Sequence, residues 1–117
     1  MEEFVISEKI IDRTIILYLN GFLDAHTSNV LEKKFEELIK EQKYRIIVNF
    51  NGLSYISSAG LGVFMAYIEN MRKNNGDIKL SNMSEKIFNI FDMLGFPILF
   101  EIYKEESEAI EKYNNIN

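Results

Sequence analysis

The side chains best suited to chemistry are two adjacent serines, Ser57 and Ser58, which precede the run Ala-Gly-Leu-Gly at 59–62. The apolar spacing after them predicts the start of a helix, where backbone N–H groups lack intrahelical partners and the dipole favours negative charge. Two exposed hydroxyls there are suited to carry a phosphate, which would add roughly −1.5 to −2 charges. A structural role fits equally well, since serine is a preferred N-cap and Gly60 and Gly62 permit close helix–sheet packing.

Enzyme motifs around these serines are incomplete. A nucleophile elbow needs glycine two residues before its serine, but Tyr55 and Ile56 occupy those positions. The glycine run lacks the Lys-Ser/Thr pair of a phosphate-binding loop, and Met65 stands where a dinucleotide fingerprint needs its third glycine. His26 is the only histidine, and a solvated loop or capping role is far commoner for it than a role as a lone base. The sequence therefore predicts a protein that is not an enzyme.

Composition excludes several further classes. The chain contains no cysteine, which removes disulfides, thiolate metal sites and thiol catalysis. Its 13 Lys and Arg against 18 Asp and Glu give a formal charge of −5, whereas nucleic-acid contacts need clustered cations. The acids do not cluster at ligand spacing outside solvated helix faces. We therefore expect no nucleic-acid partner, no metal and no cofactor.

Residues 46–68 carry no charge, and a stretch of that length is long enough to span a bilayer. Its five Asn and Ser residues and three glycines make a poor membrane helix, so we interpret it as a buried strand, a turn and a buried helix face. The acidic start, Met1–Glu3, lacks the basic region of a signal peptide. These features predict a soluble, cytoplasmic protein without membrane insertion.

The elements that must position the serines alternate between strand-like and helix-like periods. Strands are predicted over 5–11, 14–19, 45–50, 77–80 and 98–103, and helices over 27–39, 58–72, 84–94 and 105–113. At 47% hydrophobic, 117 residues suffice for one core, so we expect a single domain over 1–117. The order β-β-α-β-α-β-α-β-α implies an α/β fold, a mixed β-sheet with four helices packed on it.

Local signals set the boundaries of these elements. Asp12-Arg13 is predicted to turn the first hairpin, and Asn20-Gly21 to end its second strand. Thr27 is a plausible N-cap of the first helix, and Gly76 is suited to a left-handed cap after the second. In the second helix, Leu61, Phe64 and Ile68 share one stripe and are predicted to face the core.

Three segments resemble the STAS domain and, within it, the bacterial anti-sigma-factor antagonists. They are Asn-Gly-Leu-Ser-Tyr-Ile-Ser-Ser-Ala-Gly-Leu-Gly-Val-Phe at 51–64, Leu-Asn-Gly-Phe-Leu-Asp at 19–24 and Ile-Phe-Asp-Met-Leu-Gly-Phe at 90–96. Their separations also match, so the resemblance covers nearly the whole chain. It implies the STAS-like mixed β-sheet.

The resemblance also implies a modification site. In such proteins a serine at the start of the second helix is phosphorylated by a partner that is both an anti-sigma factor and a serine kinase, and a serine phosphatase is the opposing partner. Alignment on the Gly-Leu-Gly run places the acceptor at Ser58, with Ser57 where the family often has Asp and Ala59 where it often has Ser or Thr. Asp24 matches a family acid near the phosphosite, although a helix-entry capping role fits it as well. The implied partner-binding residues are Asp24, Ser57, Ser58, Ala59, Gly60 and Leu61.

The mechanism implied by the resemblance is a switch by partner exchange. The unphosphorylated domain would bind the anti-sigma factor and free the sigma factor, and phosphorylation would release it. Two other classes stay open. One is a non-switching STAS module of a lipid-transport ATPase or a stress-sensing assembly, which would not need Ser58. The other is a small-molecule or nucleotide binder, which the glycine run permits.

Overall fold

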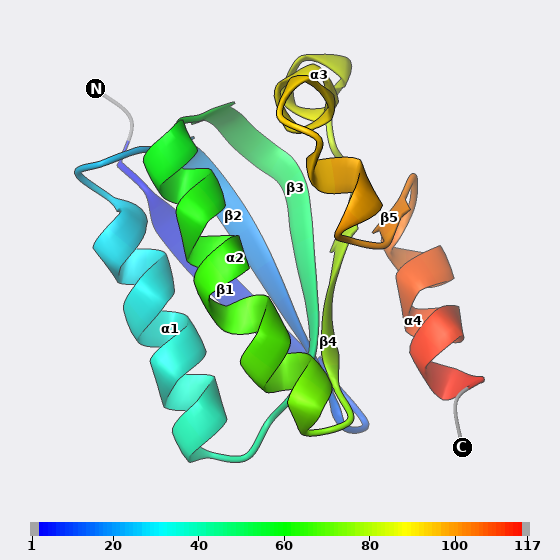
Figure 1. Ribbon diagram of the computed structural model, residues 1–117. Helices are drawn as coiled ribbons and strands as arrows, with labels where there is room; N and C mark the ends of the chain where they lie inside the picture. The colour runs from blue at the N-terminus through cyan, green and yellow to red at the C-terminus, as the bar shows by residue number, and fades with distance from the viewer. Residues whose placement is uncertain (1–2, 116–117) are drawn as a thin grey trace.

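Five strands and four helices follow the predicted order in the computed structural model, which describes residues 3–115 (Figure 1). The strands are β1 (Val5–Ile11), β2 (Thr14–Leu23), β3 (Arg45–Ile56), β4 (Asp77–Ser81) and β5 (Ile102–Tyr103). The helices are α1 (Ser28–Lys40), α2 (Ser58–Lys73), α3 (Glu85–Met93) and α4 (Glu106–Asn114), with a 3₁₀ turn over Phe96–Ile98. The α/β class and the mixed sheet are confirmed.

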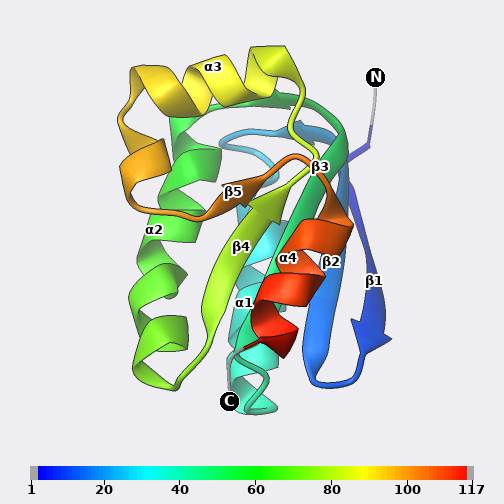
Figure 2. The ribbon, with the colours of Figure 1, turned by 90° about the vertical axis from the view of Figure 1, so that its right-hand side faces the viewer.

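The strands lie in the sheet in their order along the chain, β1-β2-β3-β4-β5. β1 runs antiparallel to β2, through a turn in which Asp12 has a positive φ of 55°, and the other pairs are parallel. Helices α1 and α2 cover one face of the sheet and α4 covers part of the other, while α3 lies at the end where β3 finishes (Figure 2). The parallel ladder therefore delivers the carboxyl ends of β2 and β3 to one end of the domain.

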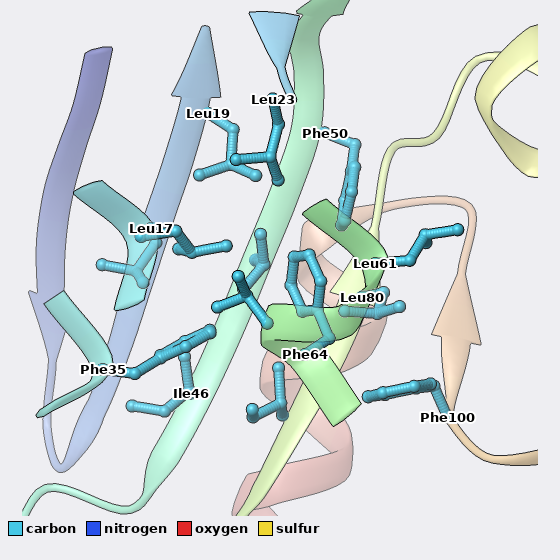
Figure 3. Packing of buried hydrophobic residues seen from close by; sticks show 14 of the residues in the cluster. Leu17, Leu19, Leu23, Phe35, Ile46, Phe50, Leu61, Phe64, Leu80 and Phe100 are labelled. Carbon is cyan, nitrogen blue, oxygen red and sulfur yellow. The ribbon is translucent and has the colours of Figure 1, made fainter. Parts of the chain in front are cut away.

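The main core lies between the sheet and helices α1 and α2 (Figure 3). Strand residues such as Leu17, Leu19 and Val48 are fully buried against Phe35 of α1 and Phe64 of α2. The stripe predicted for α2 is confirmed, since Leu61, Phe64 and Ile68 are 1%, 0% and 7% exposed. This packing fixes the rotation of α2 about its axis, and with it the direction in which the helix start faces.

Both central strands run further than predicted. Asn20-Gly21 does not end β2, which continues to Leu23, and β3 extends past residue 50 to Ile56. Gly21 instead lies where the register between β2 and β3 shifts. Its φ is 100°, and a Cβ there would clash with the carbonyl oxygen of Glu3. The glycine thus permits a close approach within a strand rather than terminating the strand.

Two boundaries late in the chain also differ from prediction. The left-handed residue after α2 is Asn75, with φ 66°, and not Gly76. Gly76 is required for space, because a Cβ there would lie 2.0 Å from the carbonyl oxygen of Tyr44. The strand predicted over 98–103 is reduced to Ile102–Tyr103, since Gly95 adopts φ 77° and Pro97 supports a 3₁₀ turn.

The face of the sheet beneath α4 is partly polar. On β4, Lys79 is 2% exposed, and its Nζ lies 2.9 Å from Asp77 Oδ2, 3.0 Å from Glu101 Oε1 and 4.7 Å from the centre of the Tyr113 ring. The Tyr113 hydroxyl oxygen lies 2.8 Å from the carbonyl oxygens of both Ile46 and Asp77. One tyrosine of α4 thus contacts the backbone at the start of β3 and β4.

Candidate functional site

The start of α2 presents one free hydroxyl. Ser57 is the N-cap, and its Oγ accepts a hydrogen bond from the backbone N–H of Gly60 at 3.5 Å. Ser58 is the first helical residue and is exposed, and within residues 3–115 its hydroxyl has no hydrogen-bond partner. The two serines therefore differ: Ser57 caps the helix, and the hydroxyl of Ser58 is exposed to solvent.

Gly60 holds this helix start close to the sheet. A Cβ at Gly60 would lie 2.8 Å from Leu23 Cγ and 2.9 Å from the Leu23 carbonyl oxygen. The prediction of a tight approach is confirmed for Gly60. It is wrong for Gly62, which is exposed and has no atom within 4 Å of an added Cβ. The difference follows from helical geometry, because two residues of rotation carry Gly62 to the solvent face.

The end of β2 lies directly beside the serines. Leu23 pairs with Ile56, and the backbone N–H of Ser57 donates to the Leu23 carbonyl oxygen at 2.9 Å. Asp24 follows this junction on one strand and Ser58 follows it on the other, so the topology brings together residues separated by more than 30 positions in sequence. The helix dipole at this point favours negative charge.

Asp24 has a defined structural role. Its Oδ1 accepts hydrogen bonds from the backbone N–H groups of His26 at 2.9 Å and Thr27 at 3.2 Å. Thr27 occupies the N-cap position of α1, but its side chain makes no cap bond to that helix. Instead its hydroxyl donates to the Phe22 carbonyl oxygen at 2.8 Å and accepts from the Asp24 N–H at 2.9 Å. Asp24 and Thr27 together brace the turn into α1, as expected from the structural interpretation of Asp24.

The six residues predicted to bind a partner gather at this end but differ in accessibility. Ser58 and Ala59 are exposed, and Asp24 and Ser57 are partly buried. Gly60 and Leu61 are buried, with Leu61 only 1% exposed (Figure 3). Contact with another molecule is thus open to the first four, whereas the last two fix the helix start from beneath.

Sequence analysis missed an exposed aromatic pair next to this site. Phe22 and Tyr55 are partners in the β2–β3 register, and they are 39% and 41% exposed with ring centroids 6.0 Å apart. The following pair, Leu23 and Ile56, is buried, so alternation turns the aromatic rings to the other face. The same alternation was visible in the sequence, but predicting both strands too short concealed it. Phenylalanine and tyrosine are enriched in protein–protein interfaces relative to the rest of the surface.

Metal binding and membrane insertion can be compared with the described part of the structure. Within residues 3–115 no three His, Cys, Asp or Glu side chains are grouped so as to hold a metal ion. No helix among these residues has the length and apolar character needed to cross a membrane. The uncharged stretch 46–68 consists of β3 followed by the first turns of α2, as interpreted from its polar residues.

Comparison with known proteins agrees with this architecture. The STAS domain matches residues 6–109, and the chain belongs to the STAS family. It is 28% identical over 100 residues to the anti-sigma-B factor antagonist of Bacillus subtilis, which covers 86% of this chain and 91% of that protein. It is 27% identical over 97 residues to the anti-sigma F factor antagonist of Paenibacillus polymyxa, covering 82% of this chain and 83% of that protein.

Solved structures share the fold. An anti-sigma factor antagonist from Mycobacterium paratuberculosis superposes with a TM-score of 0.88 at 15% identity, covering 97% of this chain and 96% of that one. The Bacillus cell fate determinant SpoIIAA in its phosphorylated form superposes with a TM-score of 0.73 at 25% identity, covering 93% of this chain and 99% of that one. The phosphorylated form is a property of SpoIIAA.

Proposed function

We propose that this protein is an anti-sigma-factor antagonist whose binding surface is the end of the domain formed by Asp24, Ser57, Ser58 and Ala59. It binds an anti-sigma factor and thereby frees a sigma factor for transcription. Membership of the STAS family and the likeness to the Bacillus and Paenibacillus antagonists support this assignment. The observation that carries it is the exposed, unbonded hydroxyl of Ser58 at the first position of a helix anchored in the core.

Phosphorylation of Ser58 switches the binding off. The anti-sigma factor, acting as a serine kinase, transfers the γ-phosphoryl group of ATP to Ser58 Oγ, the hydroxyl proton is lost, and ADP leaves. The helix end accommodates the new charge, because the N–H groups of its first turn point toward it. Within an interface the same dianion must be desolvated, which weakens the complex. A serine phosphatase hydrolyses the ester and restores binding.

The domain itself has no turnover in this scheme. It is the substrate of the kinase and works in the cytoplasm, where sigma factors meet RNA polymerase. Gly60 and Leu61 contribute by fixing the start of α2 rather than by touching the partner, since both are buried. The exposed pair Phe22 and Tyr55 lies one register position before the Leu23–Ile56 junction and extends the surface open to a partner.

Phosphate transfer from radiolabelled ATP tests the proposal. The protein is incubated with and without its cognate kinase-like anti-sigma factor, and the products are separated by gel electrophoresis. We expect labelling only with that partner, unchanged in Ser57→Ala and lost in Ser58→Ala. Labelling that persists in Ser58→Ala, or a wild-type protein that the partner binds but never labels, would contradict the switch.

A further inference from the structure

A second concave site lies at the opposite end of the sheet from Ser58. Three connections meet there, namely those between β1 and β2, between α1 and β3, and between α2 and β4, at the lower end of the view in Figure 1. They border an open cavity of about 400 Å³, a size typical of small-molecule sites. Its apolar walls come from Ile10, Ile15 and Tyr44. The cavity shares no residue with the site at the start of α2.

The charge around this cavity is opposite in sign to that of the whole protein. Arg13, Lys43 and Arg45 line it together with a single acid, Asp12, which gives a local formal charge of +2 in a chain of −5. Lys43 is paired with Glu41 at 3.0 Å. Within residues 3–115 neither arginine has a carboxylate partner. Arg13 and Arg45 thus line the hollow without a counter-ion from the protein, and the guanidinium of Arg45 is directed toward Tyr113.

The two arginines near the cavity differ in what surrounds their side chains. Arg45 begins β3, and its guanidinium lies 3.4 Å from the carbonyl oxygen of Tyr113 and 5.9 Å from the centre of that ring. Arg13 occupies the two-residue turn between β1 and β2 and is exposed. A guanidinium presents a planar fork of donors that matches a carboxylate, so Arg13 is the group available to bind one.

Backbone contacts hold the walls of the cavity in place. The Asp77 N–H donates to the Tyr44 carbonyl oxygen at 2.9 Å, and the Lys43 N–H donates to the Leu38 carbonyl oxygen at 2.9 Å. Gly76 packs so closely on Tyr44 that no Cβ fits between them. A site whose backbone is already fixed loses little conformational entropy on binding. Ile10, 55% exposed, is the apolar surface that a ligand would cover.

From the cavity, its apolar walls and its unpaired arginines, we propose that this end of the domain binds a small organic carboxylate with an apolar body. The carboxylate pairs with Arg13, and the apolar body covers Ile10. A carboxylate matches the planar fork of the exposed Arg13 guanidinium, and the aliphatic and aromatic side chains of the lining fit an apolar body. This site is separate from the proposed switch and does not depend on it.

Titration of the ¹⁵N-labelled full chain with 2-naphthoate, followed by amide chemical shifts, tests this site. We expect saturable shifts confined to residues 10–15, 42–45 and 74–75. The matched neutral compound 2-naphthylmethanol should bind at least about tenfold more weakly. The variant Arg13→Gln should weaken naphthoate binding by a similar factor with an unchanged thermal midpoint, because Arg13 is exposed. Lys86→Gln, an exposed substitution on α3, is the control and should bind like wild type.

Any of the following outcomes would overturn the proposal. One is equal affinity for the acid and the alcohol, which would leave only hydrophobic contact. Another is a set of shifts centred on the exposed apolar residues Met93 and Ile98 instead of the cavity. The third is naphthoate binding that is unaffected by Arg13→Gln, or no saturable shift at all. None of these results depends on Ser58 or on a kinase, so the site and the proposed switch fail independently.

Discussion

The backbone N–H of Ser57 donates to the carbonyl oxygen of Leu23 at 2.9 Å, joining the start of α2 to the end of β2. This bond continues the strand ladder by one position beyond the Leu23–Ile56 pair. It places Asp24 and Ser58 at the same end of the domain, each one residue past the hydrogen-bonded pair Leu23 and Ser57. The candidate surface therefore depends on the pairing of two strands, not on one flexible loop.

Charge at position 58 is expected to control partner binding. Ser58→Asp places a carboxylate at the exposed helix start, where the dipole tolerates it but a closely packed partner does not. We expect the affinity for the anti-sigma factor to fall about tenfold or more, or about 1.4 kcal/mol and above. Ser58→Ala should keep wild-type affinity and resist release by ATP. Titration calorimetry measures all three proteins, and equal affinity of Ser58→Asp and wild type would refute the switch.

Ser57→Ala separates capping from modification. It removes the side chain that accepts from the Gly60 N–H, so we expect a loss of about 1 kcal/mol in the free energy of unfolding. Phosphorylation at Ser58 should persist. Urea denaturation and the labelling assay check the two halves of this prediction. Full stability combined with lost labelling would show that the acceptor is Ser57, one residue from the expected position.

Two glycines in one helix turn should respond in opposite ways. Gly60→Ala forces a methyl group to within 3 Å of Leu23, and we expect it to cost about 1–3 kcal/mol through overpacking. Gly62→Ala meets nothing and should stabilise the helix by about 0.5–1 kcal/mol, since alanine is the better helix former. Urea midpoints of the two variants decide the matter. If both variants lost a similar amount of stability, α2 would be rotated from the orientation described.

Removal of the buried cation should be costly. Lys79→Met removes the buried cation that pairs with Asp77 and Glu101, but Arg72 Nε still lies 2.9 Å from Asp77 Oδ1, so we expect a loss of about 1–3 kcal/mol in the free energy of unfolding. Methionine retains much of the volume, so the effect reports charge rather than a cavity. Lys86→Met on the exposed face of α3 is the control, expected to change stability by less than about 0.5 kcal/mol. Equal midpoints for both variants would mean that the ion pair contributes nothing net.

Alkaline pH should destabilise the fold through Tyr113. Burial raises the pKa of its phenol above the ordinary value of 10.0, and the nearby Asp77 carboxylate raises it further. Because the folded protein holds this pKa above the unfolded one, the phenol's contribution is complete below pH 10 and is lost as the pH rises beyond it. We expect the urea midpoint to fall above pH 10.

Tyr113→Phe provides the comparison. It removes hydrogen bonds to Ile46 and Asp77 and should cost about 1–3 kcal/mol at neutral pH. It should also make the alkaline decline shallower. Some decline should remain, because burial and a hydrogen bond to Glu36 raise the pKa of Tyr67 to about 12. An identical pH slope in Tyr113→Phe and wild type would contradict the assignment.

Periodicity predicted the elements here but not the contacts that end or bend them. The stripe of Leu61, Phe64 and Ile68 was readable because a helix repeats its own geometry. The continuation of β2 through Gly21 was not readable, because the need for glycine there comes from the backbone of Glu3, which precedes β1. Gly76 is likewise required because it packs against the backbone of Tyr44, and not because it ends its own helix. Such constraints join residues distant in sequence, and a single chain's pattern does not reveal them.

In the candidate site, too, local features could be predicted from the sequence and contacts between distant segments could not. Ser57 and Ser58 were found because capping and helix start are local features. The aromatic pair Phe22 and Tyr55 was missed because its exposure depends on the register of two strands that run longer than their apolar pattern predicted. The cavity at the opposite end of the sheet could not be predicted either, because its residues come from three separate connections, none of which carries a sequence motif.

The arrangement of strands in chain order has a consequence for biosynthesis. Each strand finds its neighbour already present as the chain lengthens, and no strand must insert between two that are paired. We expect amides of β2 and β3 to be protected early in pulse-labelled hydrogen exchange, and those of α4 to be protected last. A chain in which α4 has not yet docked would expose the charged face around Lys79 to water, so we expect docking of Tyr113 to be the step that covers this face.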